Sequence, residues 1–578
     1  MGFIPKIAFA ILLLSNARCS MIRGGRTISG FILNDLGPVT GAVVRVRTTT
    51  IFTLSDRSGK FVLSGIPKGR QVELTAYAPG SYIAGPVSAH SGASRISLVL
   101  KKHPAEDNPD YRWVSAFRAE GAAGNCENCH SDPQDPNSAL PFDEWRRDAH
   151  GTSATNPRFL SMYNGTDLSG TRRSPKTRYI VDRDYGRFPR PPDPKEPYYG
   201  PGYLLDSLSS PGDCAACHLP AAAVRAPYGT DPTGTTSTHR ESIACDLCHK
   251  IWAVKLDPAT GSPRPNMPGV MSFEFRRPGE GHQLFIGPYD DVAPGEDTYS
   301  PLQRQSRICA PCHFGEFWGV RVYNSFGEWL ASPYADPKTG QTCQDCHMPR
   351  RGARHIALPE KGGQARNPGT VFSHLMPGAA DETLLRDTAK LEIEGLAREG
   401  RIRVDVRVTN EKGGHHIPTD HPARNILLVV SATDARGSEL EDLGTQRIPE
   451  WGGQGNDDDD YAGRPGKGYA KILEELWTGV SPTAAYWRQT RLRSDTRIPA
   501  KETDVTHYEF RAPNGGGPVT VKARLIFRRA FKTLANQKSW NVPDILMNDA
   551  SLSVPTTPGN DRRDSGAAEN VDPHRRRG

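Results

Sequence analysis

The sequence lacks a long apolar run beyond its first residues, and this excludes a membrane-spanning body. A transmembrane helix needs about 20 consecutive apolar residues, and the mean hydropathy over the whole chain is −0.56. Glycine and proline are frequent, at 57 and 49 of 578 residues, but remain below the level of low-complexity chains. We therefore expect a soluble, loop-rich protein of several domains with modest cores.

The one apolar run lies at the N-terminus and predicts export. Lys6 precedes the short apolar stretch IAFAILLLS, and small residues end the segment at Ala17. This is the pattern of a secretory signal peptide over residues 1–17. A membrane anchor is the alternative, but the run is short for one, and Arg18 disfavours a lipid on Cys19. We expect a periplasmic protein, with the cell surface or exterior as the alternative.

Cysteine is almost absent outside one repeated pattern. Apart from Cys19, the ten cysteines form five C-x-x-C pairs, and a histidine directly follows each pair. The five segments are CENCH (126–130), CAACH (214–218), CDLCH (245–249), CAPCH (309–313) and CQDCH (343–347). C-x-x-C-H is the attachment motif of c-type haem. The sequence therefore predicts five covalently bound haem c groups.

The spacing has a chemical reason. The two thiols form thioethers with the two vinyl groups of one porphyrin, and the adjacent histidine ligates the iron from the proximal side. A thioredoxin-type C-x-x-C needs no histidine, zinc would leave five histidine placements unexplained, and thioethers would consume the thiols that disulfides need. The predicted attachment residues are Cys126, Cys129, Cys214, Cys217, Cys245, Cys248, Cys309, Cys312, Cys343 and Cys346. The predicted proximal ligands are His130, His218, His249, His313 and His347.

The regions on either side of the motifs alternate apolar and polar residues. Residues 25–101 contain no cysteine and carry turn residues every eight to twelve positions, which predicts a small β-sandwich. The stretches GPVTGAVVRV and SDRSGKFVLSGIPKGR resemble a carboxypeptidase regulatory-like (transthyretin-type) domain, which implies a spacer or docking module. Residues 381–555 predict a second β-sandwich. Residues 556–578 are polar and predict a disordered tail.

Residues 105–380 hold all five motifs. We expect a loop-rich, mainly helical pentahaem cytochrome c domain there, because haems replace much of a side-chain core. The second and third motifs begin 31 residues apart, and the fourth and fifth 34 residues apart. Such short separations favour close pairs of haems. The acidic loop GNDDDDYAG (455–463) is interpreted as solvated, with a hard cation as the alternative.

The formal charge of +7 does not predict nucleic-acid binding. Each haem adds about two propionate charges against about one positive charge at a ferric centre. The loaded protein is then near neutral, so we interpret the basic residues as compensation for propionates. No nucleic-acid partner is expected.

The remaining histidines are candidates for the distal side of the irons. A second strong ligand suits a haem to electron transfer, whereas an open position permits chemistry on a small molecule. The distal candidates are His150, His374, His415, His282 and His239. His416 is the alternative to His415 on the loop GGHHIPTDHPARN, and His355 and His421 come after these. Met348, Met376 and Met267 are methionine alternatives.

These pieces together resemble a known group. The repeated C-x-x-C-H, CQDCHMP, the following SHLMPGA and then GGHHIPT are similar to periplasmic multihaem cytochromes related to the tetrahaem electron acceptor of hydroxylamine oxidoreductase and to pentahaem nitrite reductase. The resemblance implies mostly bis-histidine haems in stacked pairs that conduct electrons. Pentahaem nitrite reductases usually carry C-x-x-C-K at the catalytic haem, and all five motifs here end in histidine, which makes nitrite reduction less favoured.

Two functions are therefore expected to compete. The first is an electron relay between a redox protein donor and acceptor, with association with a membrane or cell-surface electron-transfer complex as one arrangement. The second is an oxidoreductase that acts on a small nitrogen or sulfur compound at one haem with an open distal site. No catalytic residue is assigned. Helpers for the second function would come from TRYIVDRDYG, with Tyr179, Arg183 and Tyr185.

Overall fold

A computed structural model describes residues 26–118, 125–174, 179–182, 186–189, 193–207, 209–234, 241–293, 295–386 and 388–557. The predicted signal peptide, His239, Arg183, Tyr185 and nearly all of the predicted tail lie outside these residues. The chain divides into two compact units. Unit 1 combines residues 1–107 with 278–300, and unit 2 combines 108–277 with 301–578. Residues 278–300, predicted within the haem segment, thus belong to unit 1.

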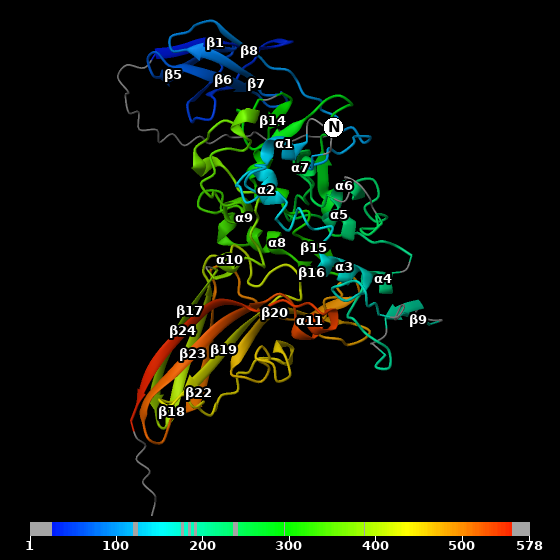
Figure 1. Ribbon diagram of the computed structural model, residues 1–578, viewed down its shortest axis with the longest axis vertical. Helices are drawn as coiled ribbons and strands as arrows, with labels where there is room; N and C mark the ends of the chain where they lie inside the picture. The colour runs from blue at the N-terminus through cyan, green and yellow to red at the C-terminus, as the bar shows by residue number, and fades with distance from the viewer. Residues whose placement is uncertain are drawn as a thin grey trace, which may run out of the picture. The chain divides into compact units, whose positions relative to one another are not determined.

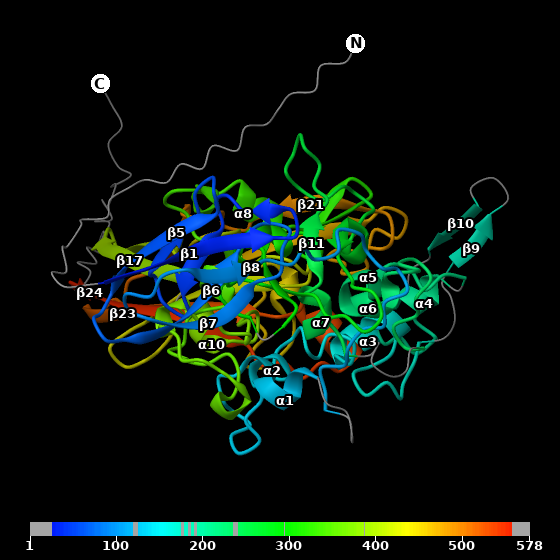
Figure 2. The same cartoon turned by 90° about the horizontal axis from the view of Figure 1, so that it is seen from above.

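Unit 1 contains two four-stranded sheets (Figures 1 and 2). The first joins β2, β1 and β5, with β8 parallel to β1, and the second has the order β4-β3-β6-β7. A short parallel pair, β13 and β14, comes from residues 278–300. The strands are β1 (Arg26–Asn34), β2 (Gly37–Pro38), β3 (Val43–Val46), β4 (Phe52–Leu54), β5 (Lys60–Ile66), β6 (Gln71–Tyr77), β7 (Ala84–His90), β8 (Ile96–Val99), β13 (Phe285–Gly287) and β14 (Asp297–Tyr299).

The two sheets of unit 1 share one apolar core. Ile28 and Leu63 from the first sheet and Val44 and Leu74 from the second are each fully buried in it. Burial alternates along β5, as expected for a strand with one face on a core. The segment 278–300 is tied to the sandwich by polar contacts, among them the Arg45–Asp290 ion pair at 2.7 Å. The strand-rich N-terminal region expected from the sequence is thus present in the described strands, and its two sheets share this core.

The motif-bearing part of unit 2 has little regular structure. Among its described residues the longest α-helix, α3, has eight residues. The α-helices are α1 (Cys126–His130), α2 (Pro141–Trp145), α3 (Pro157–Asn164), α4 (Tyr203–Asp206), α5 (Cys214–His218), α6 (Pro220–Ala223), α7 (Cys245–Cys248), α8 (Ser325–Leu330), α9 (Cys343–His347) and α10 (Glu382–Arg386). The 3-10 helices are η2 (Gly269–Ser272), η3 (Pro301–Arg304), η4 (Ser306–Ile308), η5 (Pro333–Ala335), η6 (Pro359–Lys361) and η7 (Pro368–Thr370).

The expectation of a mainly helical motif segment is not supported. Three two-stranded sheets lie among the short helices. Their strands are β9 (Tyr179–Asp182), β10 (Gly186–Pro189), β11 (Ile251–Val254), β12 (Phe273–Phe275), β15 (Gly315–Phe317) and β16 (Val320–Tyr323). The physical reason is that a C-x-x-C-H segment needs only one turn of helix. Proline follows the histidine within three residues in the first, second and fifth motifs, at Pro133, Pro220 and Pro349, and in the third motif strand β11 begins two residues after His249.

The C-terminal part of unit 2 is a β-sandwich, seen as the group of long strands in Figure 1. A three-stranded sheet has the order β17-β18-β22, and a five-stranded sheet has the order β21-β20-β19-β23-β24. The elements are β17 (Ala389–Arg398), β18 (Arg401–Asn410), β19 (Asn425–Thr433), η8 (Glu450–Gly452), β20 (Gly466–Glu475), β21 (Thr490–Asp495), β22 (Thr503–Arg511), β23 (Gly517–Arg528), α11 (Lys532–Lys538) and β24 (Ile545–Thr556).

Strand periodicity explains this sandwich. β18 alternates exposed and inward residues, and its Val404, Val406 and Val408 enter the core between the sheets. β19 is central in the larger sheet and is buried on both faces over its first six residues. No helix among the described residues is long and apolar enough to cross a membrane.

The loop between β18 and β19 is held by its first strand. Asn410 is fully buried, and its side-chain Nδ2 donates to the carbonyl oxygens of His415 at 2.7 Å and Ile498 at 3.1 Å. Its Oδ1 accepts from the backbone nitrogen of Gly413 at 3.0 Å. Residues 411–424, which we name the histidine loop, are therefore fixed at one end of the sandwich.

Candidate functional site

Four of the five C-x-x-C-H segments begin an α-helix at their first cysteine. These are α1, α5, α7 and α9, and two of them have a side-chain cap at the N-terminus. The Asn125 side chain accepts from the Asn128 nitrogen, and Thr342 forms a capping box with Asp345. In the fourth segment a turn follows η4, and the His313 nitrogen donates to the Cys309 oxygen at 3.1 Å. All five segments thus reach the histidine through one turn.

Thiols of different motifs meet in unit 2. Hydrogen bonds between thiols join the first motif to the third, the second to the fourth, and the fourth to the fifth, and in each pair the bond lowers the pKa of one thiol and raises that of the other. The pairs are Cys126 with Cys245, Cys217 with Cys312, and Cys309 with Cys343. Cys248 of the third motif is also an electrostatic neighbour of Cys312. The fourth motif therefore adjoins the second, third and fifth.

A close backbone approach supports the contact between the second and fourth motifs. Gly269 donates its backbone nitrogen to the Pro311 oxygen at 2.7 Å. It has φ of 54°, and a Cβ at this position would lie only 2.0 Å from the carbonyl oxygen of Ala216. Only glycine fits between these two motifs.

His347 and His415 face each other with nearly parallel rings. Their ring centres are 6.3 Å apart, with an angle of 12° between the planes. The Nδ1 of His347 bonds to the Pro377 carbonyl oxygen at 2.7 Å, and the Nδ1 of His415 to the His416 carbonyl oxygen at 2.9 Å. Backbone carbonyls thus fix both rings through Nδ1, and Nε2 is the nitrogen left for a metal.

His313 and His150 form a second pair, with ring centres 6.2 Å apart and tilted by 59°. Here carboxylates take the place of backbone carbonyls. Nδ1 of His313 lies 3.2 Å from Asp420 Oδ2, and Nδ1 of His150 lies 2.7 Å from Asp148 Oδ1. Burial alone would lower the pKa of His313, but Asp420 outweighs burial and raises it to about 9.

Two further predicted proximal histidines, His130 and His218, each have another histidine as an electrostatic neighbour. These neighbours are His374 for His130 and His421 for His218. Burial and then His130 lower the pKa of His374 to about 4. Burial, Arg424 and His218 likewise lower the pKa of His421 to about 4. A neutral imidazole keeps a lone pair for a metal at neutral pH. The Phe159 ring also lies flat on the His218 ring, 3.9 Å between centres.

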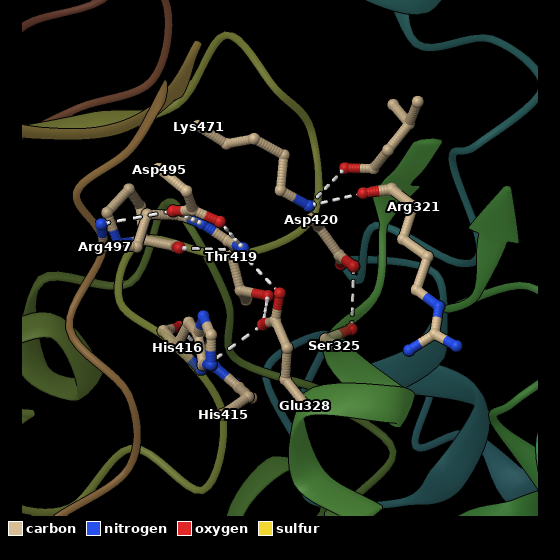
Figure 3. A network of polar contacts seen from close by, with 12 residues as sticks. Arg321, Ser325, Glu328, His415, His416, Thr419, Asp420, Lys471, Asp495 and Arg497 are labelled. Carbon is tan, nitrogen blue, oxygen red and sulfur yellow. Dashed lines mark hydrogen bonds and ion pairs between the residues drawn. The ribbon is translucent and has the colours of Figure 1, made fainter. Parts of the chain in front are cut away.

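Figure 3 shows how α8 holds the histidine loop. Glu328 accepts from the His416 nitrogen at 3.3 Å and from the Thr419 hydroxyl at 2.6 Å, and Arg497 donates to its other oxygen at 2.6 Å. The side chains of Glu328 and Arg497 are 3% and 5% exposed. Because both charges are buried together, the ion pair fixes the loop against the motif segment.

The structure brings together some predicted distal residues and not others. His150, His374 and His415 each lie beside a proximal histidine. His282 belongs to unit 1, where its Nδ1 lies 2.8 Å from Glu296 on an exposed side chain. His239 lies outside the described residues. Met376 contributes a backbone nitrogen to Asp148 at 3.1 Å.

Sequence reasoning placed His421 below the other distal candidates and did not select either carboxylate. The signal that could have indicated them is local: Asp148 precedes His150 by two residues, and Asp420 directly precedes His421. The acidic loop is likewise explained by local pairing, since Lys532 forms ion pairs with Asp457, Asp459 and Asp460. Within the described part of the chain no group of three or more His, Cys, Asp or Glu residues is arranged to hold a metal ion.

Comparisons with known proteins add little information about this chain. No family model matches the chain, and no curated protein matches it. A penta-haem cytochrome c552 from Thermochromatium tepidum is similar in structure, with 19% identity, a TM-score of 0.49, and coverage of 74% of this chain and 97% of that one. A type II cohesin–X-dockerin complex from Acetivibrio cellulolyticus gives 18% identity, a TM-score of 0.12, and coverage of 14% and 58%. Both scores are too low to carry functional information.

Proposed function

We propose that this protein is an exported pentahaem c-type cytochrome that relays electrons between redox partners. The observation that carries the proposal is the set of five C-x-x-C-H segments, four of which have a second histidine beside the proximal one. Haem attached in this way supplies one-electron chemistry. The thiol pairs of each motif would hold one haem covalently.

The ring spacings fit two imidazoles on one iron. A metal–imidazole bond is about 2 Å long, so two rings on opposite sides of one metal have centres about 6 Å apart. The observed separations are 6.3 Å for His347 with His415 and 6.2 Å for His313 with His150. We therefore assign His415 and His150 as the distal ligands at the fifth and fourth motifs.

The same reasoning extends to two other motifs. His374 is assigned to the distal side at the first motif, opposite His130, and His421 at the second, opposite His218, on the basis of their electrostatic contacts and burial. His421 thus takes a place for which His239 was one candidate. The histidine loop, from the C-terminal sandwich, would then supply ligands to two haems.

The contacts between thiols give an order for the relay. Each pair of thiols marks one edge of a porphyrin, so thiols in contact bring two porphyrin edges together. The first motif would exchange electrons with the third, and the third with the fourth. The fourth would also reach the second and the fifth. The pathway is therefore branched at the fourth motif.

The partners follow from the chemistry of a relay. We propose a redox protein donor and a redox protein acceptor outside the cytoplasm, in the periplasm or at the cell surface. The signal-peptide pattern of residues 1–17 and covalent haem attachment support export. Docking on a membrane-bound electron-transfer complex is one arrangement, and nucleic acid is not a partner.

The experiment is expression with a cytochrome c maturation system, followed by haem counting and spectroscopy. The pyridine haemochrome assay and the intact mass should give five haems per chain. Oxidised protein should show low-spin EPR signals for its bis-histidine haems and should be reversibly reducible in five one-electron steps. Fewer than five haems would contradict the assignment. One stoichiometric high-spin haem that binds nitrite, hydroxylamine or CO would instead favour the oxidoreductase.

A further inference from the structure

The two well-defined histidine pairs differ in what their Nδ1 atoms contact. At the fifth motif, both His347 and His415 bond to backbone carbonyl oxygens. At the fourth motif, both rings bond to carboxylates, with Asp420 on His313 and Asp148 on His150. The separations of the ring centres are nearly equal, at 6.3 and 6.2 Å. The group that accepts the hydrogen bond from Nδ1, a carbonyl oxygen or a carboxylate, is therefore a main chemical difference between the two sites.

Other contacts hold both carboxylates in place. Asp148 has a side chain that is 3% exposed, and it accepts from the backbone nitrogens of His150 at 2.8 Å and Met376 at 3.1 Å. Asp420 accepts from the Ser325 hydroxyl at 2.7 Å. Its φ of 63° lies in the left-handed region, which a residue other than glycine adopts at some cost. The loop thus accepts local strain that places this carboxylate beside His313.

Two cations lie near Asp420. Lys471 is an electrostatic neighbour of Asp420, and its Nζ donates to the carbonyl oxygens of Arg321 at 2.6 Å and Val322 at 3.0 Å. Arg424 lies 3.9 Å from Asp420 and donates to the Thr419 carbonyl oxygen at 3.1 Å. It therefore offsets Asp420 in part. Its distance is longer than a direct hydrogen bond, so the Asp420 oxygens remain available to Ser325 and His313.

A carboxylate acceptor makes an imidazole a stronger electron donor than a carbonyl acceptor does. The bond draws the Nδ1 proton toward the acceptor and raises the basicity of the ring. A more basic ligand and a nearby negative charge both stabilise the more positive oxidation state of an iron. The reduction potential of that iron falls as a result.

We propose that Asp148 and Asp420 are positioning residues that set the reduction potential at the fourth motif below that at the fifth. This inference rests on the proposed function, since it presupposes haem at both motifs. The thiols of Cys309 and Cys343 meet between these motifs. Electron transfer from the fourth motif to the fifth is then downhill, which gives that arm of the relay a direction.

The test is a redox titration of full-length holoprotein followed by visible and EPR spectroscopy, for the wild type, Asp420→Asn and Asp148→Asn. Asparagine keeps the size and an acceptor oxygen but removes the charge. Each variant should raise the midpoint potential of one of the five redox transitions. The expected change favours the reduced form of that haem by about tenfold, which corresponds to about 59 mV for one electron. The double variant should raise the same transition further. The g-values of one low-spin signal should shift in step.

The matched control is Asp405→Asn, a surface carboxylate on β18 that also bonds to a histidine Nδ1, that of His507, at 2.7 Å. It should leave all five transitions unchanged. The inference would be overturned if the midpoint potentials of both variants equal those of the wild type while five haems are bound and the circular dichroism spectrum is unchanged. The proposed function would then remain intact. Failure of both variants to load five haems would assign the carboxylates a purely structural role and also overturn it. Fewer than five haems in the wild type would instead contradict the proposed function.

Discussion

At the scale of single residues, two neighbouring histidines have different surroundings. The His415 ring lies parallel to that of His347, whereas the backbone of His416 is bonded to Glu328. The ring geometry therefore favours His415 as the ligand. His416 supplies the carbonyl that orients the ring of its neighbour.

We predict that His415→Ala converts one haem to high spin and leaves the other four unchanged, because the iron at the fifth motif loses its sixth ligand. EPR and visible spectra of the oxidised holoprotein measure this directly. His416→Ala should leave the spin state of every haem as in the wild type, as should His507→Ala, whose side chain is 73% exposed. Unchanged spin states in His415→Ala would show that His415 is not an iron ligand.

The sequence alone named several of these residues as candidates. The C-x-x-C-H pattern is chemically specific, and His150, His374 and His415 follow recognisable local segments. From the sequence, His421 had a low rank and Asp420 was not selected, because their neighbours His218 and His313 are distant in the chain and meet them only in the folded structure. The local signal is the position of each carboxylate one or two residues before a histidine, and it does not identify His313 as the ring that Asp420 contacts.

At the scale of elements, a buried ion cluster joins the C-terminal sandwich to the motif segment. Arg488 donates to Asp206 of α4 at 2.7 Å and to Glu475 of β20 at 2.8 Å, and all three side chains are at most 3% exposed. The Trp487 indole also donates to Asp206 at 2.8 Å. This cluster fixes α4 against the sandwich.

Arg488→Met should destabilise the protein by about 3–5 kcal/mol, because it leaves two buried carboxylates without their cation. Urea unfolding followed by tryptophan fluorescence measures the change in midpoint. The control is Arg491→Met. The Arg491 side chain is 64% exposed and pairs with Glu474, so its loss should lower the free energy of unfolding by at most about 1 kcal/mol. Equal shifts for the two variants would contradict the assigned role of the cluster.

The start of the histidine loop is the second element open to test. Asn410→Ala removes the bonds to His415, Ile498 and Gly413, which should cost about 1–3 kcal/mol through unsatisfied buried groups. Because the His415 backbone is then released, we also expect a fraction of one haem to become high-spin in EPR. A loss of stability with wholly low-spin haem would show that Asn410 supports the sandwich alone.

Element prediction succeeded where periodicity exists. The alternation of β18 and β5 is plain in the sequence and in the structure. The expected helices of the motif segment had no such pattern behind them. That expectation came from the type of cofactor, and the described α-helices of the motif segment have only four to eight residues.

At the scale of the whole molecule, the two kinds of region should depend differently on haem. Helices of four to eight residues have little intrinsic stability, whereas the sandwich cores contain their own buried apolar side chains. We therefore predict that protein made without haem is cleaved by protease mainly within residues 108–277 and 301–380, with fragments from both sandwiches surviving. Mass spectrometry of timed digests, with the holoprotein as control, tests this. Equal resistance of the motif segment would contradict it.

Asp420 and His421 are consecutive, with Cα atoms about 3.8 Å apart, yet they serve different motifs. Asp420 bonds to His313, and His421 neighbours His218. One peptide unit therefore connects the second and fourth sites mechanically. If reduction at one site moves this unit, the affinity of the other site for an electron must change, and the effect is reciprocal. Electrons at these two sites would then bind cooperatively or anticooperatively.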